Sequence, residues 1–253
     1  MTLVRVQNVS FGYSADRRIL DDVSLDIAVG DTIGLVGESG SGKTTLLRLL
    51  LGLARPDSGT ISFDGQKLDP SNRAFMRDFR RQAQVVYQDP YSSLDPRQTI
   101  FSIIAEPLRS LKIGGDHAKL VGDALEAVGL DRDVAARYPH QFSGGQRQRI
   151  AIARAIVPGP RLLLADEAVS ALDLTTRTRI VDLLSRLSQD MSLLFVSHDI
   201  GVVAALCRRI VILEKGRIVE AGDTRQVLAQ PQHPYTQRLL ASVPRLSLTQ
   251  EPS

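Results

Sequence analysis

A glycine-rich segment near the start of the chain has the residue types and spacing that bind phosphate. The pattern G-x-x-x-x-G-K-[ST] is matched at every fixed position by Gly37, Glu38, Ser39, Gly40, Ser41, Gly42, Lys43 and Thr44. In loops of this kind the backbone amides surround a β-phosphate, while the lysine reaches the β- and γ-phosphates and the last hydroxyl ligates Mg²⁺. Residues 32–36 predict a buried strand before the loop, and residues 45–51 predict a helix after it.

A pair of carboxylates follows an apolar run later in the chain. Residues 161–165 predict a strand of the kind buried on both faces of a parallel sheet, and Asp166 and Glu167 come directly after it. Ligands bind at this end of the strands in open α/β sheets. Nucleotide hydrolysis needs one carboxylate for Mg²⁺ and one base for the attacking water, so we assign Asp166 to the metal and Glu167 to the base. A solvated strand end is the structural alternative.

A histidine follows another apolar strand, predicted over residues 193–196. His198 should reach the same edge of the sheet as the two carboxylates, and there it is an expected hydrogen-bond donor to a γ-phosphate. On its own, a single histidine is more often structural or on the surface. Its position after the strand favours the functional interpretation.

A second glycine-rich turn, Ser143-Gly144-Gly145-Gln146, precedes a predicted helix. Two adjacent glycines let backbone N–H groups approach an anion closely, and the start of a helix adds a partial positive charge. The chain therefore has two predicted phosphate-facing loops, which serve either one nucleotide or two. An ordinary capped helix without a ligand is the alternative.

The composition indicates a folded module with a large core. The 253 residues are 43% hydrophobic, yet no run approaches the roughly 20 apolar residues of a membrane-spanning helix. We expect no signal peptide, and the single Cys207 permits no internal disulfide. The net charge of +3 is mildly basic, but no basic block supports nucleic acid as a partner. Arg77, Arg80 and Arg81, at helical spacing with Phe79, predict a solvated face.

The elements that position these motifs fall into three stretches. Residues 1–90 alternate strands and turns, and residues 91–157 are rich in helical periodicity. From Pro158 the alternation of strands and helices resumes and includes a hairpin at Lys215-Gly216. This order predicts an α/β fold in which a helical subdomain is inserted between Gln88 and the second glycine-rich turn.

Taken in order, the motifs resemble those of the nucleotide-binding subunit of an ATP-binding-cassette (ABC) transporter, over nearly the whole chain. The matching positions are an adenine-stacking aromatic at Tyr13, the phosphate loop, the Q-loop glutamine Gln88, the signature Ser143–Gln146, Asp166, Glu167, the D-loop Ser170–Asp173 and the switch histidine His198. The resemblance implies ATP and Mg²⁺ as cofactors, catalysis by Glu167, His198 and Gln88, and metal ligation by Thr44, Gln88 and Asp166. The implied nucleotide contacts are Tyr13, Gly37, Glu38, Ser39, Gly40, Ser41, Gly42, Lys43, Thr44, Thr45, Ser143, Gly144, Gly145, Gln146 and Asp173.

The resemblance also implies a P-loop NTPase core with a parallel sheet, an N-terminal antiparallel β subdomain and an inserted helical subdomain. We expect a single ABC ATPase domain over residues 1–253. Within it, 1–90 and 158–230 form the core with the β subdomain, 91–157 form the helical signature subdomain, and 231–253 form a short C-terminal tail. A hinge at 88–96 would couple the γ-phosphate at Gln88 to rotation of the helical subdomain.

In such proteins two cassettes pair head to tail, and this answers the question of the two loops. Ser143 and Gly145 of one cassette are implied to contact the γ-phosphate of ATP held by the other, with Asp173 along the seam. ATP binding then favours the paired state over the separated one. A chain with one copy of each motif is expected to pair with a second cassette.

Two segments resemble the oligopeptide, dipeptide and nickel importer group. They are residues 87–97 and residues 231–240, the latter ahead of Val243-Pro244. For the second segment, a generic tail helix is the alternative. Two departures from the family pattern are Phe142, where leucine is usual, and Ala168-Val169, where Pro-Thr is commoner. The solute, whether an oligopeptide, a dipeptide, nickel or another small molecule, stays open.

The group implies a peripheral protein at the cytoplasmic face of the inner membrane, driving import. The implied partners are two transmembrane permease subunits, a second ABC ATPase and an extracytoplasmic solute-binding protein, and we expect no nucleic acid. The second ATPase is expected to be a different chain, with a homodimer as the alternative. A soluble cassette of assembly, DNA maintenance or translation is the other function considered. The stretch between Lys43 and Ser143 is too short for the coiled-coil arms of DNA-maintenance cassettes.

Overall fold

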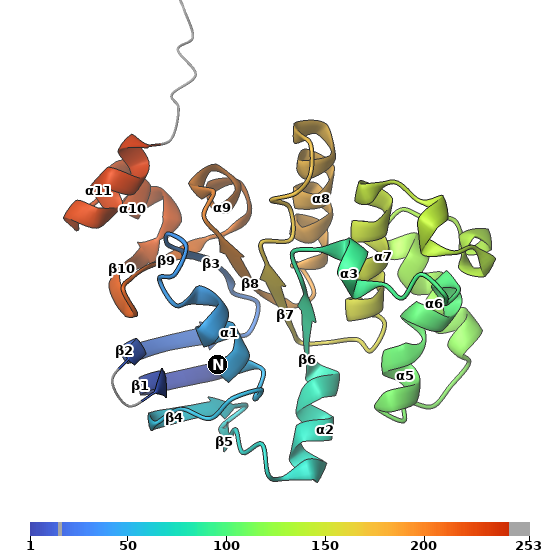
Figure 1. Ribbon diagram of the computed structural model, residues 1–253, viewed down its shortest axis with the longest axis horizontal. Helices are drawn as coiled ribbons and strands as arrows, with labels where there is room; N and C mark the ends of the chain where they lie inside the picture. The colour runs from blue at the N-terminus through green and yellow to red at the C-terminus, as the bar shows by residue number, and fades with distance from the viewer. Residues whose placement is uncertain (15–16, 243–253) are drawn as a thin grey trace, which may run out of the picture.

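The central element of the fold is a six-stranded sheet in the order β10-β9-β3-β8-β7-β6 (Figure 1). A computed structural model describes residues 1–14 and 17–242. The strands of this sheet are β3 (Thr32–Val36), β6 (Ala83–Val86), β7 (Leu162–Asp166), β8 (Ser192–Ser197), β9 (Arg209–Glu214) and β10 (Arg217–Asp223). All neighbours pair in parallel except β10, which pairs antiparallel with β9 at the edge. The predicted parallel sheet is confirmed.

A second sheet, of four strands, is antiparallel and comes mostly from the N-terminal part of the chain. Its order is β2-β1-β4-β5, with β1 (Thr2–Ser14), β2 (Arg17–Ala28), β4 (Ser58–Phe63) and β5 (Gln66–Lys67). The amide of Asp21 in β2 donates to the carbonyl of Gly216, in the hairpin turn before β10, at 2.9 Å. The two sheets therefore adjoin at one edge, and the expected N-terminal antiparallel sheet is confirmed.

Both faces of the six-stranded sheet are buried, in two separate cores. Alternate residues of each strand point to opposite faces, so that Leu164 and Val196 join the core beneath the antiparallel sheet while Ala165 and Phe195 join the other. Helix α1 (Lys43–Leu50) packs in the first core, between the two sheets. Continuous apolar strands are typical of parallel sheets covered on both sides, and this arrangement explains the runs seen in the sequence.

The helices of the second core include a group that extends beyond the β6 edge in Figure 1. This group comprises α3 (Pro90–Ser93), α4 (Ile100–Ile104), α5 (Glu106–Ser110), α6 (His117–Ala127), η1 (Arg132–Ala136), η2 (Pro139–Gln141) and α7 (Gly144–Ile156). The other helices packed near this face are α8 (Leu174–Leu187), α9 (Ile200–Leu206), α10 (Thr224–Ala229) and α11 (Pro234–Ala241). Residues 91–157 thus contain helices and no strand in the described chain, although the subdomain boundaries stay a prediction.

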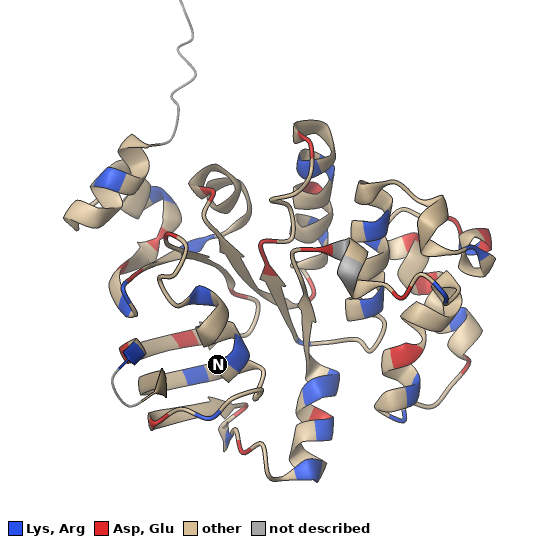
Figure 2. Ribbon diagram, in the orientation of Figure 1, with Lys and Arg blue, Asp and Glu red and all other residues tan. Residues whose placement is uncertain are grey.

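Helix α2 (Arg73–Gln82) carries the arginine face expected from the sequence. Met76 and Phe79 are buried, whereas Arg77, Arg80 and Arg81 are exposed. Figure 2 shows the basic residues as blue bands along the ribbon of this helix. The separation of apolar and charged positions at helical spacing identifies a solvated surface.

The C-terminal part ends in two short helices, α10 and α11. Val243 and Pro244, and with them the end of the predicted tail, lie outside the described residues. Within the described chain, none of the helices combines the length and apolar character needed to cross a membrane.

Candidate nucleotide site

The predicted phosphate loop connects β3 to α1, as expected from the strand and helix patterns. Gly37 has no room for a side chain, because a Cβ there would lie 2.2 Å from the carbonyl oxygen of Leu213 in β9. Gly42 has a φ of 110°, which side-chain-bearing residues rarely adopt. Close packing against β9 and a left-handed turn before the helix therefore both require glycine in this loop.

Lys43 is buried and lies over its own loop. Its Nζ donates to the carbonyl oxygens of Gly37 and Glu38 at 2.7 and 2.9 Å. Burial lowers the pKa of the Lys43 ammonium, and the nearby charges of Glu167 and Asp166 act in the opposite direction. The lysine is thus a desolvated cation that faces two carboxylates, an arrangement suited to binding anionic phosphate.

Asp166 and Glu167 lie at the end of β7, beside this lysine. Burial raises the pKa of Asp166, the charge of Glu167 raises it further, and the Lys43 ammonium lowers it. Two neighbouring carboxylates repel each other when both are negatively charged. A cation bound between them stabilises both in the ionised form. The electrostatics at this strand end fit the predicted metal role of Asp166.

Glu167 stands at a strained point of the backbone, with a φ of 47°. Its N–H donates to the carbonyl of Val196 at 2.9 Å, and its Oε1 lies 3.2 Å from Nδ1 of His198. The ends of β7 and β8, which are parallel neighbours, bring the two side chains together. A left-handed non-glycine residue persists only where its surroundings hold it, and such residues cluster at functional sites.

A hydrogen-bonded chain leads from the Q-loop to Glu167. The amide Nε2 of Gln88 donates to Oγ of Ser170 at 3.1 Å, and the Ser170 hydroxyl donates to the carbonyl oxygen of Glu167 at 3.0 Å. Ser170 appeared in the sequence only as a member of the D-loop segment. Its bridging position had no signal in the sequence, because it depends on how two loops meet.

Tyr13 lies at a cavity of about 320 Å³ that the phosphate loop also lines. The lining residues are Tyr13, Arg17, Ile19, Ser39, Gly40, Gly42, Lys43, Thr44, Thr45 and Glu167. Tyr13 is 62% exposed, and its ring packs edge-on against that of Phe11 at 5.1 Å between centroids. An exposed aromatic beside a phosphate loop supports the predicted stacking role, and Arg17 and Ile19 are neighbours that no sequence motif indicated.

The signature lies away from this cavity, at the start of α7. Oγ of Ser143 accepts from the N–H of Gln146 at 3.3 Å, and Oε1 of Gln146 accepts from the N–H of Ser143 at 3.0 Å. This reciprocal cap is the structural alternative weighed from the sequence, and it leaves Ser143 and Gln146 exposed. A Cβ on Gly145 would lie 2.3 Å from Cγ2 of Thr176 in α8, so the second glycine is required by packing.

Helices α1 and α7 pack in different cores, on opposite faces of the sheet. The phosphate loop and the signature of one chain consequently do not line one cavity in the described structure. Asp173 is likewise exposed, and its carboxylate accepts from the N–H of Thr176 at 3.0 Å as the cap of α8. The structure brings together the loop, the carboxylates, His198 and Tyr13, and it places Ser143–Gln146 apart from them.

The residues predicted to hold Mg²⁺ are Thr44, Gln88 and Asp166, all of which offer oxygen ligands. Mg²⁺ is usually bound through one or two carboxylates together with substrate phosphates. The described residues contain no cluster of three or more His, Cys, Asp or Glu side chains suited to a metal. The donor set therefore fits a metal that arrives with a nucleotide.

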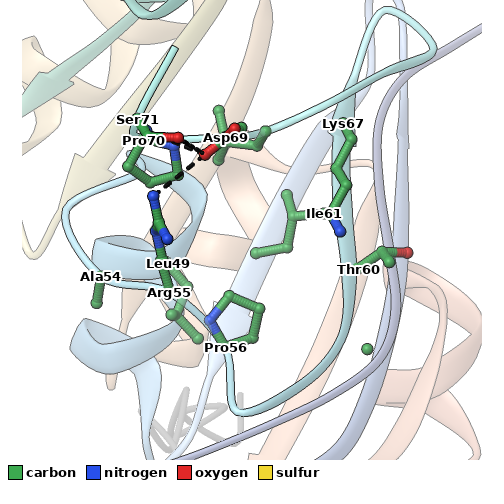
Figure 3. Close-up of a pocket in the computed structure, with 12 residues that line it drawn as sticks. Leu49, Ala54, Arg55, Pro56, Thr60, Ile61, Lys67, Asp69, Pro70 and Ser71 are labelled. Atoms are coloured by element: carbon green, nitrogen blue, oxygen red, sulfur yellow. Dashed lines mark hydrogen bonds and ion pairs between the residues drawn. The ribbon is translucent and has the colours of Figure 1, made fainter. Parts of the chain in front are cut away.

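A second hollow, of about 350 Å³, lies between the end of α1 and strands β4 and β5 (Figure 3). Three of its polar side chains pair with one another: Arg55 pairs with Asp69 at 3.2 Å, and the Ser71 hydroxyl donates to the same carboxylate at 2.7 Å. None of the residues predicted to bind nucleotide lines it. This hollow gives no indication of a ligand.

Comparison with known sequences shows to which protein family the chain belongs. The sequence profile of the ABC transporter family matches residues 20–170, which include the phosphate loop, the signature and both carboxylates. The chain belongs to the ABC transporter family. A second profile, of the oligopeptide/dipeptide transporter C-terminal region, matches residues 219–252 of this cassette. The family and group inferred from the motifs are both confirmed.

Curated relatives of this cassette are named for import. The glutathione import ATP-binding protein GsiA of Escherichia coli K12 is 50% identical over 229 residues, covering 89% of this chain and 37% of GsiA. GsiA of Salmonella typhimurium is 49% identical over the same length, with the same coverage. The cassette spans little more than a third of the length of these relatives.

Solved structures share the fold over almost their whole length. CbiO1 of Clostridium perfringens, part of the ABC transporter complex cbiONQ, superposes with a TM-score of 0.82 at 26% identity, covering 90% of this chain and 91% of its own. The ATP-binding cassette MJ0796, solved as a dimer bound to ADP and Pi, has a TM-score of 0.77 at 30% identity, covering 88% and 99%. The ABC cassette fold expected from the motifs is confirmed, and ATP is the nucleotide that this family binds.

Proposed function

We propose that this chain is the ATP-hydrolysing subunit of an ABC importer that takes up short peptides. The observation that carries the proposal is the arrangement at the end of β7, where Glu167 lies beside His198 and faces the buried Lys43 of the phosphate loop. A phosphate-binding cation, a metal-binding carboxylate and a base are thereby available at one edge of the sheet. The matches to transporter components favour import over the soluble alternative.

Each side chain has a separate part in the proposed reaction. Lys43 binds the β- and γ-phosphates. Asp166, the Thr44 hydroxyl and Gln88 would hold Mg²⁺, which would supply positive charge to offset that of the transferring phosphoryl group. Glu167 accepts the proton of the attacking water, and His198 donates a hydrogen bond to the γ-phosphate. The Glu167–His198 contact fixes the carboxylate before the water arrives.

We further propose that a complete site needs a second cassette. The exposed signature supports this pairing. Ser143 caps the N-terminus of α7, and this helix end lies on the surface, away from the chain's own phosphate loop. Paired head to tail, the signature of one cassette binds the γ-phosphate held by the other. The dimeric state of MJ0796 is consistent with such pairing. A sister ATPase as the second cassette and a homodimer remain the two forms to be distinguished.

The proposed contact with the two permease subunits lies beside the Q-loop. A groove of about 230 Å³ there is lined in part by Leu53, Tyr87, Glu106 and Leu111, and both Leu53 and Tyr87 are large exposed apolar side chains. Because Tyr87 directly precedes Gln88, a permease loop in this groove would move the segment that senses the γ-phosphate. A cassette bound to permeases in this way would lie at the cytoplasmic face of the inner membrane, with an extracytoplasmic solute-binding protein on the other side.

The proposed solute is a short peptide. The C-terminal profile is that of oligopeptide and dipeptide transporters, and the curated relatives are named for glutathione, a tripeptide. Glutathione is therefore the first solute to test. Nickel stays the alternative, since the motif segments are shared with nickel importers.

The test is reconstitution with the permeases and binding protein recovered with the chain from native membranes. We expect ATP hydrolysis in proteoliposomes to rise with glutathione or a di- or oligopeptide and not with Ni²⁺. Stimulation by Ni²⁺ alone would transfer the assignment to metal import. Recovery of the chain without any permease would contradict the transporter function itself.

A further inference from the structure

The hydroxyl of Tyr235 contacts the phosphate loop. Tyr235 lies in the first turn of α11, is only 3% exposed, and accepts a hydrogen bond at 2.9 Å from the backbone N–H of Glu38. The two residues are 197 positions apart in the sequence, and Glu38 is the second residue of the loop. Helix α11 belongs to the region matched by the oligopeptide/dipeptide transporter profile. A segment typical of this transporter group therefore touches the nucleotide loop directly.

The peptide group between Gly37 and Glu38 makes hydrogen bonds on both sides. Its N–H donates to Tyr235, and its carbonyl oxygen accepts from Lys43. The Gly37 carbonyl and the Glu38 N–H belong to the same peptide plane, and the carbonyl accepts from Lys43 Nζ at 2.7 Å. A peptide bonded at both its N–H and its C=O cannot rotate freely, and the two hydrogen bonds polarise and strengthen each other. Tyr235 thus fixes the orientation of the Gly37–Glu38 peptide plane, to which the Lys43 ammonium is hydrogen-bonded.

Helix α11 is itself held firmly enough to act as a support. The carboxylate of Glu220 in β10 accepts from the N–H groups of Gln232 and His233 at 2.9 and 3.1 Å. Nδ1 of His233 accepts from the N–H of Tyr235 at 3.2 Å, and Pro234 occupies the first turn. Gln232, His233 and Pro234 thereby orient the start of the helix, so that the Tyr235 side chain reaches the loop.

We propose that Tyr235 is a positioning residue for ATP binding, acting through the Gly37–Glu38 peptide on Lys43. The proposal rests on the ATP-binding function given above. Its hydroxyl keeps the Gly37 carbonyl turned toward Lys43, so that the ammonium is placed over the loop before the β- and γ-phosphates bind. In this chain, the segment matched by the C-terminal transporter profile consequently packs against the nucleotide loop.

The test compares two substitutions in α11, each of which removes one buried hydroxyl group. Tyr235→Phe removes the acceptor and keeps the ring. Thr236→Val removes a fully buried hydroxyl that lies by Glu220 and, among the described residues, makes no hydrogen bond to the loop. We expect Tyr235→Phe to weaken the ATP Kd about three- to tenfold, as loss of a hydrogen bond to a part-buried donor does. Thr236→Val should leave it unchanged. Hydrogen exchange of the Glu38 amide should accelerate only in Tyr235→Phe.

The outcomes separate this proposal from the proposed function. If the wild-type protein binds ATP and Tyr235→Phe binds it equally well, the positioning role is wrong while the function stands. If both variants lose affinity and thermal stability together, the effect comes from helix packing and the proposal is likewise wrong. If the wild-type protein itself fails to bind ATP, the proposed function is refuted.

Discussion

Replacing Glu167 by glutamine tests the chemistry most directly, because it removes the base and leaves its surroundings in place. Glutamine has almost the same shape and keeps an oxygen for the contact with His198, which is 3.2 Å long in the structure. The backbone bonds of residue 167 to Val196 and Ser170 do not involve the side chain. Lys43 and its loop are unchanged, so the affinity for ATP should be retained.

The expected loss of turnover follows from the missing proton acceptor. Removal of a general base lowers the rate by about 10²–10⁴, which corresponds to about 2.7–5.4 kcal/mol in the activation free energy. Stability should change little, since neutralising Glu167 relieves its repulsion with Asp166 and also removes its attraction for the Lys43 ammonium, two effects of opposite sign. The variant should therefore bind ATP, remain folded and accumulate in the paired state.

The assay is release of phosphate, measured together with ATP binding and size-exclusion chromatography in ATP. Glu126→Gln is a suitable control, because Glu126 is an exposed glutamate of α6 paired with Arg132, away from the nucleotide cavity. Hydrolysis at the wild-type rate by Glu167→Gln would show that another group is the base. A variant that is slow only because it no longer binds ATP would also refute the assignment.

Three further substitutions test the affinity for ATP and the hydrogen bonds that link Gln88 to Glu167. Lys43→Ala should abolish measurable ATP binding in a fluorescence titration, because it removes the cation that meets the β- and γ-phosphates; retained affinity would contradict that role. Tyr13→Ala should make the binding free energy of ATP less favourable by about 1–3 kcal/mol, the contribution of one stacked base, and an unchanged Kd would exclude adenine stacking. Ser170→Ala should lower kcat about tenfold without changing the ATP Kd, since it breaks the link between Gln88 and the Glu167 carbonyl; an unaltered kcat would show that this link has no part in turnover.

Local patterns predicted the elements of the fold well, because each depends on neighbours in the sequence. The strand–loop–helix around residues 32–51 and the hairpin at Lys215-Gly216 are present as expected, the latter with both turn residues at positive φ. The two apolar runs before Asp166 and His198 are adjacent parallel strands. Continuous apolar runs require burial on both faces, and only a covered parallel sheet provides it.

The site was predicted as a set of residues but not as a geometry. The sequence assigned Glu167 and His198 to one edge of the sheet, yet neither the φ of 47° at Glu167 nor its contact with His198 follows from residue types. Gly145 was assigned to phosphate contact, and the structure adds that packing against Thr176 alone already requires glycine there. The roles of Glu167, His198, Gln88 and Ser143 in hydrolysis all stay predictions.

The sequence by itself identified the family, and it predicted the nucleotide loop, the metal ligand Asp166, the general base Glu167 and the signature, because each is a short motif whose chemistry is local. Only the tertiary structure decided which of these meet within one chain: the loop meets Glu167 and Tyr13, whereas the signature faces outward on the other side of the sheet. It also decided the contact of Tyr235 with Glu38, across 197 positions. A hydrogen bond between remote segments arises from the packing of whole helices and strands, and no local pattern of residues encodes it.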